Sequence, residues 1–142
     1  MRFPVVALAV ILAGCTSSPR EAERTAMAQA AQEQALQAEL AGLVPGQPTA
    51  CLPAPTRTQL ASEGYGATIL YTAGRDLKYR NDTTGGCERI ARGDILVTRS
   101  PSGRSCRGDI ATTVDRQTGF QTGSCALGDF VTYRRPQVDG RP

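Results

Sequence analysis

The sequence ATILYTAGRDLKYR at residues 67–80 carries the clearest strand signal in the chain. Its first six residues are rich in β-branched and aromatic side chains, its centre contains a glycine, and its last four residues alternate between apolar and basic. Two such runs around a short glycine-containing turn predict a β-hairpin. Because side chains alternate along a strand, Leu77 and Tyr79 are expected on one face and Lys78 and Arg80 on the other.

Shorter β-prone runs surround this hairpin, and clusters of Gly, Pro, Asn and Ser separate them. Such spacing predicts antiparallel strands joined by turns. We predict strands at residues 95–98, 110–114 and 130–133, with a weaker one at 57–60. The predicted fold class is mainly β: a small antiparallel, disulfide-stapled sheet or barrel-like domain at residues 51–135, with a disordered tail at 136–142.

An Ala-rich helix is predicted to precede this domain. Ser18-Pro19-Arg20-Glu21 matches a capping box with Pro at the first helical position, and good helix formers continue to about Leu43. The apolar stripe of this helix is narrow; it could pack on the domain or pair with another chain, but a mostly solvated spacer is expected. Pro45-Gly46-Gln47-Pro48 should end the helix, so that residues 15–50 form a tether.

The N-terminus has the features of a secretion signal. Arg2 precedes an apolar run of eleven residues, Pro4 to Gly14, which is shorter than the about 20 residues that cross a bilayer as a helix. A short apolar segment that ends in small residues is typical of a cleaved signal peptide. Residues 1–14 are therefore predicted to be removed.

Leu12-Ala13-Gly14-Cys15 at the end of this run resembles the lipobox of bacterial lipoproteins. The resemblance implies cleavage between Gly14 and Cys15, diacylglycerol on the Cys15 sulfur and acylation of the new amino terminus; no other cofactor is expected. Thr16 stands where the inner-membrane retention signal of enterobacterial lipoproteins has Asp, which implies the outer membrane, facing the periplasm. The alternative is an ordinary signal peptide with an incidental cysteine.

The other cysteines are Cys51, Cys87, Cys106 and Cys125. An even number in a small exported domain predicts disulfides. A four-cysteine metal site or a redox centre favours C-x-x-C pairs, whereas the spacings here are 36, 19 and 19 residues. Three connectivities are available, and Cys51–Cys87 with Cys106–Cys125 is weakly preferred because it closes the shorter loops.

The composition argues against several classes of function. Removal of Arg2 with the signal leaves 15 of the 16 Arg and Lys against 13 Asp and Glu, which is not the basic surface that nucleic-acid binding requires. The sequence has no His, so histidine acid–base catalysis, Ser–His and Cys–His nucleophiles and most zinc sites are excluded. No nucleic-acid partner, metal site or catalytic residue is expected.

A short motif occurs as Arg92-Gly93-Asp94-Ile95 and again as Arg107-Gly108-Asp109-Ile110, with a partial copy at Gly128-Asp129-Phe130. Each copy immediately precedes a predicted strand. This position favours turn chemistry, in which glycine supplies an unusual backbone conformation and Asp hydrogen-bonds locally. The alternatives are carboxylates gathered for a cation or for acid–base chemistry, and an adhesion-type loop.

Three cysteine-containing segments carry a wider pattern: Tyr79-Arg80-Asn81 before Gly86-Cys87, then Ser105–Ile110, then Ser124–Phe130. They resemble a family of small proteobacterial lipoproteins of unknown function, with a strand ending in Arg-Asn and a final Cys-x-Leu-Gly-x-Phe. The chain departs at Glu88-Arg89-Ile90, where a Pro-Gly-Leu-like run is expected. The resemblance implies no activity and no functional residues.

These features favour a lipid-anchored envelope protein whose non-catalytic β domain binds another envelope component, peptidoglycan or a periplasmic protein. The alternative is a periplasmic hydrolase with paired carboxylates such as Glu63, Asp94 or Asp109, because two carboxylates can cleave glycosidic bonds without histidine. A Ser–Lys pair would need Lys78, the only lysine, which is expected to be a solvated strand residue.

Overall fold

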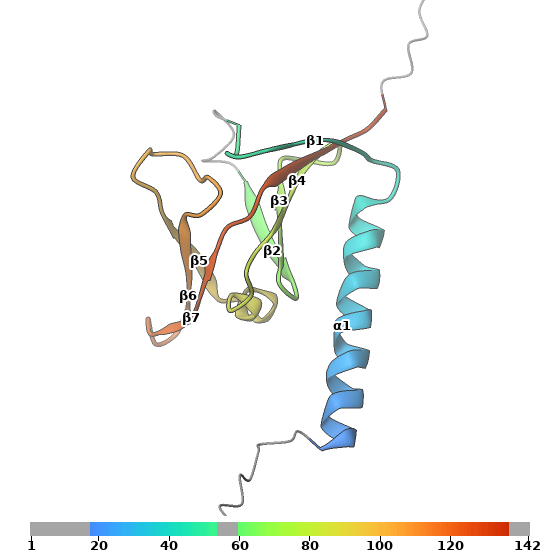
Figure 1. Ribbon diagram of the computed structural model, residues 1–142, viewed down its shortest axis with the longest axis vertical. Coiled ribbons are helices and arrows are strands. Elements are labelled where there is room, and N and C mark those ends of the chain that lie inside the picture. The colour runs from blue at the N-terminus through green and yellow to red at the C-terminus, as the bar shows by residue number, and fades with distance from the viewer. Residues whose placement is uncertain (1–17, 54–59, 137–142) are drawn as a thin grey trace, which may run out of the picture.

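The computed structural model describes residues 18–53 and 60–136, and within these residues the fold is mainly β, as predicted (Figure 1). One α-helix, α1 (Pro19–Leu40), precedes the strands, and a 3-10 helix, η2 (Glu88–Arg92), interrupts them. The strands are β1 (Val44–Thr49), β2 (Ala61–Tyr65), β3 (Thr68–Thr72), β4 (Leu77–Asp82), β5 (Ile95–Arg99), β6 (Ile110–Val114), β7 (Gln121–Ala126) and β8 (Phe130–Arg134). They form two antiparallel sheets, in the orders β1-β8-β4-β3-β2 and β5-β6-β7.

The predicted hairpin is confirmed as β3 and β4, in which Tyr71 lies opposite Tyr79. The side chains alternate as the pattern requires. Tyr71, Tyr79 and Leu77 belong to the core between the two sheets, whereas Leu70 faces the helix.

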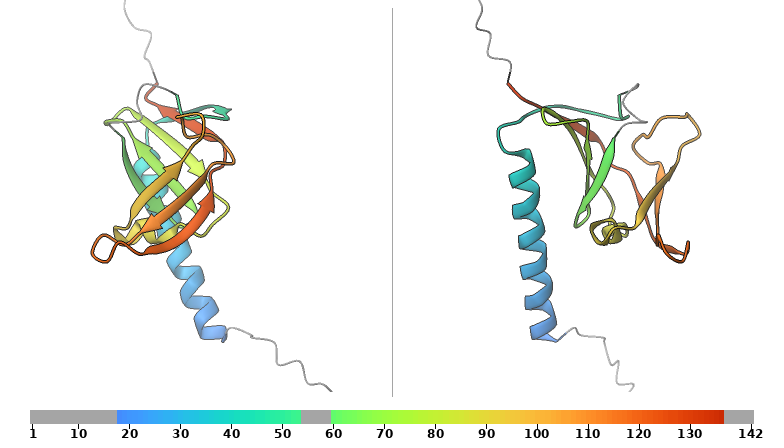
Figure 2. Two further views of the ribbon diagram at one scale, coloured as in Figure 1. Left: turned by 90° about the vertical axis from the view of Figure 1, so that its left-hand side faces the viewer. Right: turned by 180° about the vertical axis from the view of Figure 1, so that it is seen from behind.

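The elements form three layers, with α1 on one face of the five-stranded sheet and the three-stranded sheet on the other (Figures 1 and 2). β2 and β5 are the outermost strands of their sheets, and neither pairs with a further strand among residues 18–53 and 60–136. The two sheets therefore do not close into a barrel, and this part of the prediction is wrong. A barrel requires strand pairing around the whole circumference, which stops at β2 and β5.

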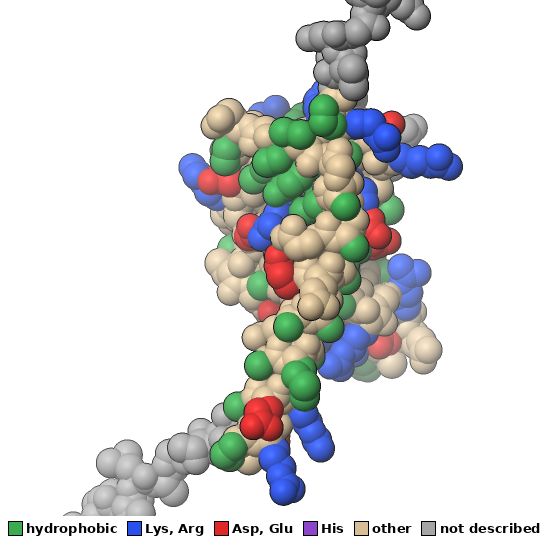
Figure 3. All heavy atoms as spheres, turned by 90° about the vertical axis from the view of Figure 1, so that its right-hand side faces the viewer, with side chains coloured by type: hydrophobic (Ala, Val, Ile, Leu, Met, Phe, Trp, Pro, Cys, Tyr) green, Lys and Arg blue, Asp and Glu red, His purple; other side chains and the backbone are tan. Residues whose placement is uncertain are grey.

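The predicted capping box is present at the start of α1. Ser18 Oγ accepts from the Glu21 amide at 3.3 Å, and the Glu21 carboxylate accepts from the Ser18 amide at 3.1 Å. The first half of α1 is exposed and projects beyond the sheets (Figure 3). Leu36 and Leu40, however, are buried against Leu70. The expectation of a mostly solvated spacer is therefore wrong for the second half of the helix, which packs on the sheet.

Lys78 lies beneath this helix and is only 7% exposed. Its ammonium group pairs with the carboxylate of Glu39 in α1. The expectation of a solvated strand lysine is wrong because the helix covers this face of β4. The pair instead helps to hold α1 on the sheet.

The predicted tether extends too far towards the domain. Residues 44–49, including the Pro-Gly-Gln-Pro run that should only end the helix, form β1 and pair with β8. β1 is an outermost strand with a register shift between Pro45 and Pro48, where the missing proline amides are tolerated. The β domain therefore starts at Val44 rather than Cys51.

Two other strands differ from the prediction. β7 was not predicted, because QTGSCA lacks the alternation of apolar and polar residues that marks a half-buried strand. β2 begins at Ala61, and residues 57–59 of the weak strand predicted at 57–60 lie outside the described residues.

The four cysteines form two disulfides, as predicted, but the preferred pairing is wrong. Cys51 is bonded to Cys106 and Cys87 to Cys125, with sequence separations of 55 and 38 residues. Shorter loops are a weak criterion, because each doubling of loop length changes the closure cost by only about 0.6 kcal/mol. Strand geometry overrides it: Cys51 and Cys106 lie opposite each other in an isolated β-bridge, and Cys87 precedes η2, which packs on β7.

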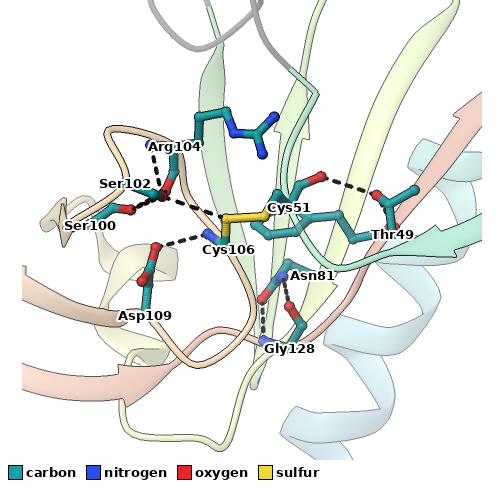
Figure 4. The surroundings of a disulfide bond; sticks show 10 residues. Thr49, Cys51, Asn81, Ser100, Ser102, Arg104, Cys106, Asp109 and Gly128 are labelled. Atoms are coloured by element: carbon teal, nitrogen blue, oxygen red, sulfur yellow. Dashed lines mark hydrogen bonds between the residues drawn. A yellow bond between two sulfur atoms is a disulfide. The ribbon is translucent and has the colours of Figure 1, made fainter.

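Two segments noted in the sequence, Tyr79-Arg80-Asn81 and Ser124–Phe130, contact each other. The side-chain Nδ2 of Asn81 donates to the Gly128 carbonyl at 2.8 Å, and the side-chain Oδ1 accepts from the Gly128 backbone N–H at 3.0 Å (Figure 4). Asn81 is fully buried, and a Cβ at Gly128 would lie 2.1 Å from the Asp82 carbonyl oxygen. These residues therefore fix the corner where the chain leaves β7 and enters β8.

The predicted signal at residues 1–14, the lipid site at Cys15 and residues 137–142 of the predicted tail lie outside the described residues. Among residues 18–53 and 60–136, no helix combines the length and apolar character needed to cross a membrane.

Candidate functional site

A cavity of about 230 Å³ lies between the outermost strands of the two sheets, β2 and β5. Three leucines, Leu52, Leu60 and Leu96, provide apolar lining. Hydroxyl groups accompany them, from Ser62, Tyr71, Thr98 and Ser105. Leucine side chains and hydroxyl groups thus line the cavity together, so it offers a ligand both apolar contacts and hydrogen bonds.

Tyr71 is the most informative residue of this cavity. Its ring packs against Phe130 in the core, with centroids 5.9 Å apart, and the residue is only 7% exposed. The hydroxyl is buried beside Thr98, yet it makes no hydrogen bond of acceptable geometry within the described part of the chain. A buried polar group without a partner costs about 1–3 kcal/mol, which an acceptor entering the cavity would recover.

Burial raises the pKa of Tyr71 to about 12, and hydrogen bonding with the Thr98 side chain, at a geometry short of a full hydrogen bond, opposes this shift. The phenol is therefore protonated at neutral pH. It can donate a hydrogen bond into the cavity, and it is a poor general base under these conditions.

On one side of the cavity, β2 presents unpaired backbone groups. β2 and β3 are joined by the two-residue loop Gly66-Ala67, so Tyr65 and Thr68 next to the loop form a hydrogen-bonded pair. Hydrogen-bonded pairs alternate along an antiparallel ladder. The N–H and C=O of Ser62 therefore point away from β3, towards the free edge.

On the other side, the same reasoning applies to β5. The Asp115 amide donates to Phe120 and the Leu127 amide donates to Asp109, so odd-numbered residues of β6 bond to β7. Even-numbered residues of β6 therefore bond to β5, where their partners are Ile95, Val97 and Arg99. The backbone groups of Leu96 and Thr98 point to the free edge, while their side chains line the cavity.

The Cys51–Cys106 disulfide fixes one end of this site (Figure 4). Next to the disulfide, the Leu52 amide donates to the Ser105 carbonyl at 2.8 Å. Leu52 and Ser105 both line the cavity. The covalent link between the segments thus positions the end of the cavity.

A second, polar hollow of about 400 Å³ lies beside η2. Ser62 borders both spaces, so together they follow the edge of β2. η2 closes this end against Gly64, where a Cβ would lie 2.9 Å from the Ala91 amide nitrogen. We refer to the cavity and the hollow together as the inter-sheet groove.

The structure does not bring all three carboxylates considered for catalysis, Glu63, Asp94 and Asp109, to one place. Asp94 precedes β5 and Asp109 precedes β6, and these antiparallel strands place the two residues at opposite ends of the ladder. Glu63 and Asp94 both border the polar hollow. A hydrogen bond from Thr122, together with the Arg89 guanidinium, lowers the pKa of Asp94. This shift favours its ionised form, whereas a general acid needs a raised pKa.

The repeated motif serves turn chemistry, as favoured from the sequence. Gly93 and Gly108 have φ values of 94° and 86°, a region that side chains with a Cβ rarely adopt. The Asp109 carboxylate accepts from the Cys106 amide at 2.8 Å.

No family model matches this chain, and neither a curated protein nor a solved structure is significantly similar to it.

Sequence reasoning did not identify Tyr71, Ser62 or Thr98 as site residues. The one available signal was the strand alternation, which places Tyr71 on the face of the sheet opposite Leu70. That its hydroxyl lacks a partner follows only from the way the two sheets pack.

Proposed function

We propose that the protein is a lipid-anchored envelope protein whose β domain binds another envelope protein or a periplasmic protein in the inter-sheet groove, without catalysis. The observation that carries this proposal is the groove itself, with a buried, unpartnered Tyr71 hydroxyl between two unpaired strand edges. A polar group in this state is rare in folded proteins unless a ligand, a water molecule or a functional role accounts for it.

The proposed location rests on the lipobox at residues 12–15 and on Thr16, which favour an anchor in the outer membrane facing the periplasm. The two disulfides support an exported protein, because such bonds persist in oxidising compartments. We propose no further cofactor beyond the lipid on Cys15.

The arrangement of α1 suits a stand-off from the membrane. The helix has 22 residues, roughly 33 Å at 1.5 Å per residue, and its exposed first half projects beyond the sheets. It packs on the face of the five-stranded sheet opposite the groove. A partner in the groove would therefore not compete with the helix.

Photo-crosslinking in cells tests the binding proposal. Benzoylphenylalanine at Ser62 in the groove is expected to give a crosslink to an envelope or periplasmic protein. The matched control carries the same group at Gln34, which is exposed on α1. The proposal would be contradicted if the Ser62 variant gave no crosslinked product, or if the Ser62 and Gln34 variants gave equal amounts of the same product.

The anchor is tested separately with Cys15→Ala. This variant is expected to lose palmitate labelling and to leave the membrane fraction. Retention of both in the variant would contradict the lipoprotein assignment.

A further inference from the structure

We infer that the ligand of the inter-sheet groove is an extended polypeptide segment that pairs with the free edge of β5 and lies over Tyr71. This inference rests on the proposed function and specifies the class of ligand. Its parts are the free backbone groups of β5, the free edge of β2 across the cavity, and the unpartnered hydroxyl between them.

The backbone of β5 is the pairing element. Leu96 and Thr98 direct their N–H and C=O groups to the free edge, and β5 is five residues long. An added strand of the same length would span about 17 Å at 3.3–3.4 Å per residue. Peptides that add to a sheet edge gain main-chain hydrogen bonds, while pockets for alternate side chains give specificity.

The cavity defines the side chain that would enter. Leu60 and Leu96 contribute apolar atoms to its lining, and Tyr71 supplies a hydrogen-bond donor. A volume of about 230 Å³ is below the roughly 300–1,000 Å³ of pockets that take drug-sized ligands. The cavity therefore suits one medium-sized side chain that combines methyl or methylene groups with an oxygen acceptor, such as Thr or Gln.

A polypeptide fits these features better than a lipid or another small amphiphile. A small amphiphile could occupy the cavity, but it would leave the edge groups of Ser62, Leu96 and Thr98 without main-chain partners. Only a polypeptide offers alternating donors and acceptors at the spacing of a strand edge.

The test starts from the mature chain with both disulfides intact. Phage-displayed linear random peptides longer than the five residues of β5 are selected on it, and the selected peptide is synthesised with a fluorescent label. Binding is measured by fluorescence anisotropy for the wild type and for three variants: Thr98→Pro, Thr98→Ala and Tyr71→Phe.

Thr98→Pro removes the edge N–H but leaves the bonds between β5 and β6, and Pro is tolerated at strand edges. Loss of one hydrogen bond is expected to weaken binding about tenfold in Thr98→Pro, with a much smaller change in the matched Thr98→Ala. Tyr71→Phe is expected to weaken binding while it raises the melting temperature, which a purely structural role of the hydroxyl would not produce.

N-methylation of the peptide gives a test that does not depend on protein variants. Two peptides are compared, one methylated on its odd-numbered amides and one on its even-numbered amides. Methylation of the set that faces β5 is expected to abolish binding, and methylation of the other set to leave it nearly unchanged. Equal binding of the two methylated peptides, equal binding to Thr98→Pro and wild type, or the absence of any selected peptide that competes at the groove would overturn the inference.

Two further outcomes separate this inference from the proposed function. A crosslink from Ser62 to an envelope protein that persists at full yield in Thr98→Pro would overturn strand pairing while supporting the function. If the protein instead forms a concentration-dependent dimer that Thr98→Pro abolishes, the occupant of the groove is a second copy of the chain. That outcome would contradict the proposal that the groove binds a different envelope or periplasmic protein, and with it the inference built on that proposal.

Discussion

Leu70 and Tyr71 are neighbours in β3 but lie on opposite faces of the five-stranded sheet. Leu70 is fully buried beneath Leu36 and Leu40 of α1, and the nearby Lys78 is paired with Glu39. Tyr71 is nearly as buried, yet its hydroxyl faces a cavity without a hydrogen-bond partner. The helix-covered face is completed within the chain, whereas the groove face leaves backbone and side-chain groups for another molecule. The first face therefore contributes mainly to stability, and the proposed binding depends on the second.

The largest expected effect is on the groove end held by the Cys51–Cys106 disulfide. The double substitution Cys51→Ser and Cys106→Ser opens a loop of 55 residues, and on the chain-entropy account this lowers the free energy of unfolding by about 4 kcal/mol. Urea denaturation measures the loss.

Because Leu52 and Ser105 would then be held by their backbone hydrogen bond without the covalent link beside it, peptide binding should also weaken in this double variant. The matched control is Cys87→Ser with Cys125→Ser, which leaves that end of the groove intact. Equal affinities in the two double variants would contradict the role given to Cys51–Cys106.

Leu70→Ala removes the central contact of the helix-covered face. Large-to-small substitution at a fully buried leucine costs about 2–5 kcal/mol through lost burial and cavity formation. Denaturation followed by circular dichroism should show this loss. The folded fraction is expected to bind peptide with unchanged affinity, and a parallel fall in affinity would show that the two faces are coupled.

Tyr71→Phe should act in the opposite direction on stability. Removal of an unpartnered buried hydroxyl is expected to raise the free energy of unfolding by about 1 kcal/mol at neutral pH. Leu70→Ala and Tyr71→Phe, at neighbouring positions, thus give changes of opposite sign. Destabilisation by Tyr71→Phe would indicate that the hydroxyl is satisfied in the folded protein.

The pH dependence of Tyr71 gives an independent measurement. Its pKa is raised from 10.0 to about 12 in the folded chain, so above pH 10 the unfolded state binds fewer protons than the folded state. Stability should therefore be fully retained below pH 10 and should fall as the pH rises towards 12. Tyr65, whose pKa burial and Glu63 also raise to about 12, contributes in the same direction. Tyr71→Phe should remove only part of this alkaline loss.

The smallest expected effect concerns the ion pair beneath the helix. Glu39→Gln removes the partner of Lys78, but the Glu39 side chain is 46% exposed, so solvent screening limits the loss to below about 1 kcal/mol. Lys78→Met is expected to be neutral or slightly stabilising, because it removes the buried charge itself. A larger loss in Lys78→Met than in Glu39→Gln would show that the pair is a major support of α1.

Local sequence predicted the elements whose signals lie within a few residues. The β3–β4 hairpin, the capping box of α1 and the turns at Gly93 and Gly108 are all confirmed. β1 and β7 were missed because their sequences, VPGQPT and QTGSCA, have poor intrinsic strand character. β1 is held in strand conformation by pairing with β8, and β7 by pairing with β6. Such pairing between distant segments cannot be recognised in the local sequence pattern.

Residue types and their short-range order thus account for the mainly β class and the presence of two disulfides, because these properties depend on composition and on neighbours in the chain. The disulfide pairing, the burial of Lys78 and the groove around Tyr71 arise from contacts between distant segments. The hydrogen-bond ladder ends at β2 and β5, and the Tyr71 hydroxyl lies between these strands without a partner. Each strand alternates by local rules, but only the packing of one sheet on the other determines which polar groups remain free for a ligand.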